Sequence, residues 1–336
     1  MVFTADLPDA QIRRTKGTVS GVMWSYFARR VVIGIPTLWA IITVCFLLMR
    51  LTPGGPFDGE APVPPAILAN LRALYHLDDP LWRQYLDYFA NLLRGDFGPS
   101  FKYRDFSVTT LIAQGFPVSL QNGFSALVLA VFIGVPLGIV AALSQNTRRD
   151  YIVSAAAMTG IVIPNFVMGH VLILVFGVWL KDSVFHLPAG GWADGAIANR
   201  ILPVLCLALP YIAYLVRITR GSMIEAMRAN YVRTARAKGL PFHLVVLRHA
   251  LKAALMPVVT FLGPATAFLL TGSMVVETIF QIPGIGRYFV QGALNRDYTL
   301  VMGVTILSAA LVIAMNLIVD LVYSLLDPKV RYESTS

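Results

Sequence analysis

The sequence predicts an all-α polytopic membrane protein, and two observations carry that prediction. The chain of 336 residues is 57% hydrophobic, with a mean hydropathy of +0.68, and only 13% of its residues are charged. An average soluble domain carries about 25% charged residues. Apolar runs close to the ~20 residues that cross a bilayer as a helix recur along the chain. We therefore expect a membrane domain over residues 31–326, between a polar N-terminal segment (1–30) and a polar tail (327–336).

Six transmembrane helices are expected. The first, Val31–Met49, has 19 residues without a charge. It is too long for the apolar core of a secretory signal, and no cleavage pattern follows it. The other five are apolar stretches of the same kind, over residues 117–143, 152–180, 201–216, 255–276 and 299–326.

A long polar segment, residues 50–116, separates the first two expected spans. It predicts two helices that are too short to cross a bilayer. One begins near Pro64-Pro65, and the other begins at Asp79-Pro80, a favourable pair for a helix start, and ends at Gly95. We expect both helices to lie on the outer surface of the bundle.

The distribution of basic residues predicts the orientation. With the N-terminus inside, the inner segments hold 17 Lys or Arg, whereas the two short outer loops hold 4. Long loops count for little under the positive-inside rule. Both termini and residues 217–257 are therefore expected in the cytoplasm. The net charge of +9 follows from this topology and does not indicate nucleic-acid binding.

The most informative stretch of the chain is Arg217–Pro257, which is basic and has a helical pattern. Ser222 followed by Glu225 forms a capping box and predicts that a helix begins there and runs to Lys238. Gly239 then favours a left-handed helix stop. The pattern predicts a cytoplasmic elbow between two helices.

The second helix of the elbow is expected to begin at Pro241, which suits a first turn. Leucines recur after it at the spacing of one helix face, which predicts a buried stripe of Leu240, Leu244, Leu247, Leu251 and Leu255. A simpler interpretation of the whole stretch is a positively charged loop that only fixes topology.

The order of residues in the elbow resembles a known motif. RTARAKGLP followed by RHALKAALMP is similar to the cytoplasmic EAA loop of ABC importer permeases, above all those of the oligopeptide and dipeptide permease group. Arg233 replaces the glutamate of the general motif and Lys252 its late proline, and both departures are typical of that group. The resemblance runs from about Arg29 to Tyr332 and includes RITRGSMIE, GSMVVETIF with PGIG, GALNRDY and DPKVRY.

The resemblance is greatest to B-type membrane subunits of bacterial oligopeptide permeases. It implies a type I ABC importer permease architecture in the bacterial cytoplasmic (inner) membrane, working by alternating access. It also implies a second permease subunit, two cytoplasmic ATP-binding subunits and an external peptide-binding protein that docks on the outer loops. The residues expected to dock on the ATPase are Arg233, Thr234, Ala235, Arg236, Ala237, Lys238, Gly239, Leu240, Pro241 and Phe242.

The chain lacks the sequence motifs of an enzyme. It has no phosphate-binding G-x-x-x-x-G-K-[ST], no H-E-x-x-H and no G-x-S-x-G. Its five histidines and two cysteines do not cluster at metal-ligand spacing. We therefore expect no catalytic, cofactor or metal site in this chain, with ATP and Mg²⁺ bound by the partner ATPase subunits.

Polar residues beside helix breakers are candidates for a substrate path. Broken transmembrane helices expose backbone groups that are tolerated only inside protein or beside a water-filled cavity. The breakers are Pro164, Pro210 and Gly263-Pro264, and the candidate path residues are Asn165, Thr266, Thr271 and Ser273, with Thr159 as a further possibility. The alternative is ordinary proline kinks and small residues at helix contacts.

Other functions remain open at this stage. The chain could be the permease of a related importer for dipeptide, nickel or glutathione. It could also be a secondary transporter or channel acting alone, but such a transporter needs ion-coupling groups. Asp320 is the one acid that the sequence places well inside an expected span. A membrane-bound enzyme is a more distant alternative.

Overall fold

The computed structural model describes residues 9–51, 78–103 and 106–326. Within these ranges the chain is helical and forms no sheet, only one isolated bridge between Pro99 and Ser107. The all-α prediction is confirmed. The expected helix near Pro64-Pro65 and the tail 327–336 lie outside the described residues, and so does the side chain of Asp320.

The helices follow one another with short connections. They are α1 (Asp9–Leu51), α3 (Leu81–Leu93), α4 (Val108–Leu143), α5 (Arg148–Val162), α6 (Asn165–Leu172), α7 (Ile197–Arg228), α8 (Asn230–Ala237), α9 (Phe242–Leu244), α10 (Leu251–Ala254), α11 (Met256–Leu270), α12 (Met274–Ile279), α13 (Ile285–Leu294) and α14 (Tyr298–Leu326). Two π-helical stretches, Ile173–Trp179 and Val245–Ala250, follow α6 and α9.

Five helices of the described chain are long and apolar enough to span a membrane, and a bent pair makes a sixth span. The bent pair replaces the single span expected over residues 152–180. Its two arms, α5 and α6 with the π-helical stretch after it, meet at 105°. Pro164 lies at the bend because it lacks a backbone N–H and pushes the preceding residue out of the helical region, and Ile163 has a ψ of 118°.

Three helix boundaries differ from the sequence prediction. Helix α1 extends back to Asp9, into the expected N-terminal segment. Helix α4 begins at Val108, where the Ser107 hydroxyl accepts a hydrogen bond from the Thr110 N–H. Helix α7 continues through the basic stretch to Arg228, because no residue between Val216 and Arg228 interrupts helical hydrogen bonding. The fourth span is therefore much longer than expected.

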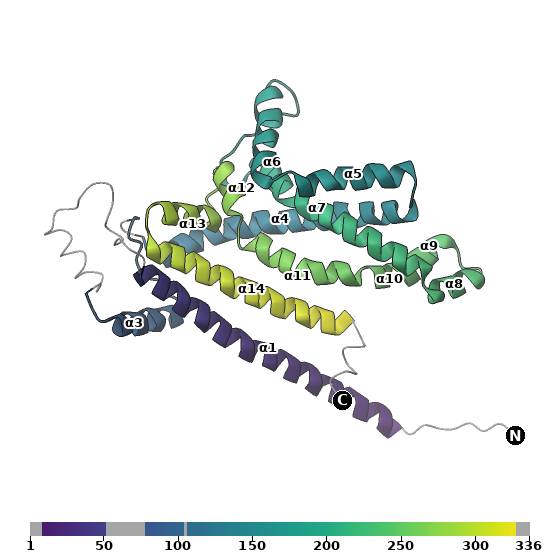
Figure 1. Ribbon diagram of the computed structural model, residues 1–336, viewed down its shortest axis with the longest axis horizontal. Helices are drawn as coiled ribbons and strands as arrows, with labels where there is room; N and C mark the ends of the chain where they lie inside the picture. The colour runs from purple at the N-terminus through teal and green to yellow at the C-terminus, as the bar shows by residue number, and fades with distance from the viewer. Residues whose placement is uncertain (1–8, 52–77, 104–105, 327–336) are drawn as a thin grey trace.

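Helices α4 and α7 form the centre of the bundle, with α5 and α11 beside them and α1 and α14 side by side along one flank (Figure 1). The beginning of α1, the end of α14 and helices α8–α10 lie at the same end, which we call the elbow end. Helices α3, α12 and α13 lie at the opposite end. This arrangement agrees with the predicted placement of both chain ends and the elbow on one side.

Glycines allow the central helices to touch. A Cβ on Gly123 of α4 would lie 2.1 Å from the Leu269 carbonyl oxygen of α11, and one on Gly138 would lie 2.6 Å from Thr219 Cβ of α7. Small residues permit such close backbone approach in membrane bundles, where dispersion contacts replace the hydrophobic effect.

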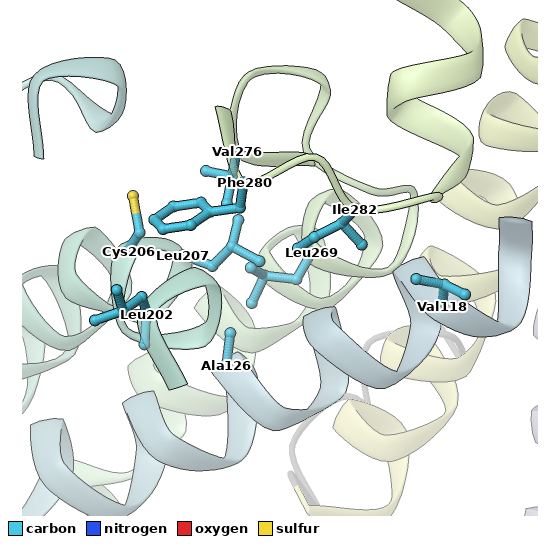
Figure 2. Packing of buried hydrophobic residues seen from close by; sticks show 10 residues of the cluster. Val118, Ala126, Leu202, Cys206, Leu207, Leu269, Val276, Phe280 and Ile282 are labelled. Atoms are coloured by element: carbon cyan, nitrogen blue, oxygen red, sulfur yellow. The ribbon is translucent and has the colours of Figure 1, made fainter. Parts of the chain in front are cut away.

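A buried apolar cluster joins α4, α7, α11 and α12 near the end opposite the elbow (Figure 2). Phe280 and Leu202 are fully buried in it, and Cys206 contributes its thiol, so that cysteine packs as a small hydrophobic residue. This cluster fixes α12 against the central pair.

Candidate functional site

The elbow projects from the bundle as a break between helices (Figure 1). Helix α7 ends at Arg228, Ala229 is extended, and α8 runs only to Ala237. Gly239 has a φ of +76°, and its N–H donates to the Arg236 carbonyl at 2.9 Å. The predicted left-handed stop at Gly239 is confirmed, and Pro241 is the residue immediately before the next helix.

The predicted capping box at Ser222 is wrong. Ser222 lies inside α7, and its hydroxyl donates to the carbonyl of Ala254 at 2.7 Å, which ties α7 to α10. A capping box forms only where the preceding backbone leaves the helix. Here α7 is already helical before Ser222, so the helix expected over 222–238 is instead split at Ala229.

The predicted leucine stripe is also wrong. Leu240 and Leu247 are exposed, and the buried positions are Val245, Val246, Ala250 and Ala254, packed on α7 and α8. A π-helical turn contains more residues than an α-turn, so Val245–Ala250 shifts which side chains face the bundle. The smaller side chains also allow the elbow to lie close to α7.

The ten residues expected to dock on the ATPase are gathered on this projection. Ala235 is buried beneath it, and the other nine are exposed. The Arg236 guanidinium lies 5.6 Å from the centre of the Phe242 ring, and this contact links α8 to α9 across the turn. The elbow thus presents basic groups beside exposed Phe242 and Leu240.

An ion pair that the sequence reasoning missed fixes the base of the elbow. Arg220 of α7 donates to both oxygens of Asp150 in α5, at 2.6 and 2.8 Å. Asp150 is 1% exposed and also accepts from the Asn146 N–H at 2.9 Å. Our attention to Arg148 and Arg149 as topology signals passed over this acid, whose placement in the first turn of α5 was the available signal.

A second missed acid organises the opposite end. Asp297 is fully buried and accepts hydrogen bonds from the Ser100 hydroxyl, the Phe101 N–H and the Leu300 N–H. It therefore caps α14 and joins that helix to the segment before α4. Its position just before an apolar helix was a sequence signal for a cap.

The candidate path residues divide into two groups. Asn165, Thr271 and Ser273 line one cavity of about 610 Å³, together with Tyr211 and parts of α1, α11 and α14. Thr266 does not line it, and its hydroxyl donates to the Leu262 carbonyl of its own helix at 2.6 Å. Thr159 is exposed and bonds within α5. No Lys, Arg, Asp or Glu is among the residues lining this cavity.

The bundle, its broken span and its exposed elbow define a helical membrane transport component. The chain belongs to the family of binding-protein-dependent transport system inner membrane components, whose model matches residues 134–332. That match includes the elbow, α7 and α11–α14.

Relatives of this chain carry more specific names. It is 54% identical over 310 residues to the oligopeptide transport system permease protein OppB of Salmonella typhimurium, covering 92% of this chain and 100% of OppB. It is 44% identical over 295 residues to the dipeptide transport system permease protein DppB of Bacillus subtilis, covering 88% and 94%.

Solved structures of the same fold are known. A chain of the inward-facing MetNI methionine ABC transporter matches with a TM-score of 0.55 at 17% identity, covering 65% of this chain and 96% of that one. The likeness establishes the type I ABC importer permease fold that the sequence predicted.

Proposed function

We propose that this chain is the membrane-spanning permease subunit of an ATP-driven oligopeptide importer. It forms the translocation path with a second permease subunit, receives peptide from an external binding protein and is driven by two cytoplasmic ATPase subunits. The observation that carries the proposal is 54% identity to an oligopeptide permease over that protein's whole length. Identity to the dipeptide permeases is lower, at 44% and 38%.

The elbow connects the ATPases to the helices in this proposal. ATP closes the ATPase pair, and the elbow passes that motion to α7 through the buried contacts of Val245 and Ala250 and the Ser222–Ala254 hydrogen bond. The Arg220–Asp150 pair carries it on to α5. The cavity beside Asn165 and Ser273 opens to take peptide, and hydrolysis of ATP resets the helices.

Three functions are distributed among the subunits. ATP and Mg²⁺ belong to the ATPases, because this sequence contains no phosphate-binding loop. Peptide recognition rests largely with the external binding protein, which we place against the end that carries α3 and α13. The elbow end and both chain ends lie in the cytoplasm, in accord with the excess of basic residues there.

Uptake by intact cells tests the proposed substrate. Cells that lack this gene should lose accumulation of a labelled pentapeptide and regain it when the gene is restored. In restored cells, unlabelled tri- to pentapeptides should compete, whereas free dipeptide, Ni²⁺ and glutathione should compete weakly. Competition by one of those three but not by longer peptides would assign the chain to a related importer instead.

A further inference from the structure

Glu277 of α12 is a buried carboxylate that the transport account above does not use. It is 2% exposed, and no basic side chain of the described residues pairs with it. Its Oε1 accepts a hydrogen bond of 2.6 Å from the Ser119 hydroxyl of α4, and its Oε2 accepts one of 3.2 Å from the Arg287 N–H. A buried charge is costly unless it is well hydrogen-bonded, so these donors determine where the carboxylate can stay.

The donors come from the beginning of α13. Gly284 precedes that helix and has no side chain to cap it. The Ile285 N–H donates to the Ser119 oxygen at 3.0 Å, and the N–H groups of Gly286 and Arg287 donate to Glu277. The first N–H groups of a helix lack partners within it and favour a negative charge. Glu277 and Ser119 therefore cap α13 from two other helices.

Glycines surround the carboxylate on the remaining sides. A Cβ added to Gly272, Gly284 or Gly286 would lie 2.7, 2.3 or 3.0 Å from a Glu277 oxygen. Gly272 also has a φ of +78°, which favours glycine independently. The chain from Thr271 to Arg287, which we call the closing segment, is thus wrapped around one carboxylate.

The closing segment borders the cavity. Residues 271–275 and Gly286 line it, together with α14 residues such as Ser308. Figure 1 places α12 and α13 at the end opposite the elbow, so the segment closes the cavity at that end. On its other side, Val276 and Phe280 are buried in the apolar cluster of Figure 2.

We propose that Glu277 is a positioning residue for transport: its hydrogen bonds to Ser119 and to the start of α13 latch the closing segment onto α4 and seal the cavity on the outer side. The assignment of the cavity to the peptide path rests on the proposed function, but the latch itself does not. Opening the outer side requires these bonds to break together. A carboxylate suits this position because every neighbouring group is a donor, whereas glutamine would turn an NH₂ group toward one of them.

Thiol accessibility tests the latch without requiring transport. Ser308→Cys places a thiol in the cavity, in a background with Cys45→Ala and Cys206→Ala. The whole transporter complex is held in right-side-out membrane vesicles and treated with a membrane-impermeant maleimide. Glu277→Gln and Ser119→Ala should each raise the labelling rate about tenfold, the order of change expected when a hydrogen bond to a charged group is lost.

Thr278→Ala is the matched control. Thr278 is the next residue in α12, but it is exposed, and its hydroxyl donates only to the Met274 carbonyl. It should label at the rate of the unlatched parent's wild-type segment. The latch is disproved if Glu277→Gln and Ser119→Ala also label at that rate, whether their abundance is normal or reduced. Absence of peptide uptake by the parent complex would count against the proposed function and would leave the labelling comparison intact.

Discussion

Replacing Gly239 with valine is expected to abolish most peptide uptake while leaving the amount of protein in the membrane unchanged. Gly239 has a φ of +76°, and an added Cβ would meet no atom within 4 Å. The effect is therefore conformational and not steric. A left-handed conformation costs a residue with a side chain roughly 1–2 kcal/mol, and a β-branched residue tolerates it least. The elbow should adopt another shape and dock poorly on the ATPase.

Gly239→Asn is the matched control, because asparagine enters the left-handed region more readily than other side chains. It should retain most of the activity. Uptake and ATP hydrolysis are measured on the reconstituted complex, beside the abundance of each variant. Normal uptake by Gly239→Val at normal abundance would return the elbow to the role of a charged topology loop.

Arg220→Met is expected to cause the largest loss of stability. Asp150 is 1% exposed and receives two hydrogen bonds from Arg220. Removing one partner of a buried pair leaves an uncompensated charge and costs about 3–5 kcal/mol. The Arg220 side chain is 32% exposed, so we expect a value of about 3 kcal/mol, at the low end of that range. The complex should unfold at a lower temperature and accumulate less.

Two further variants separate this pair from a general effect of charge. Arg217→Met removes an exposed basic group from the same helix and should be nearly neutral. Asp150→Asn combined with Arg220→Met removes the stranded charge and should recover part of the loss. Thermal unfolding midpoints of the purified complexes decide the matter. An Arg220→Met midpoint equal to that of Arg217→Met would show that the pair contributes little.

Local chemistry explains which features could be predicted from the sequence. The spans follow from hydropathy alone, and the stop at Gly239 follows from the conformational freedom of one residue. The bend at Pro164 likewise follows from its missing N–H. The leucine stripe was wrong because it assumed an α-helical period where the chain forms a π-turn.

Features that depend on distant segments were not predictable in the same way. Glu277 was assigned to an outer loop, yet it lies within a candidate span, and its partner Ser119 is 158 residues away in the chain. Asp150 and Arg220 meet only because α5 packs on α7. Three of the four candidate path residues line one cavity, although the sequence offered only their nearness to helix breakers. Their role in the path stays a prediction.

The requirement for the ATPase subunits tests the central claim most directly. Purified permease subunits, with or without the two ATPases, are reconstituted in proteoliposomes with the external binding protein and labelled peptide. We predict that peptide accumulates only when the ATPases and ATP are both present, and that Gly239→Val removes this accumulation. Accumulation driven by an ion gradient in vesicles that lack the ATPases would contradict the account and indicate a transporter that acts alone.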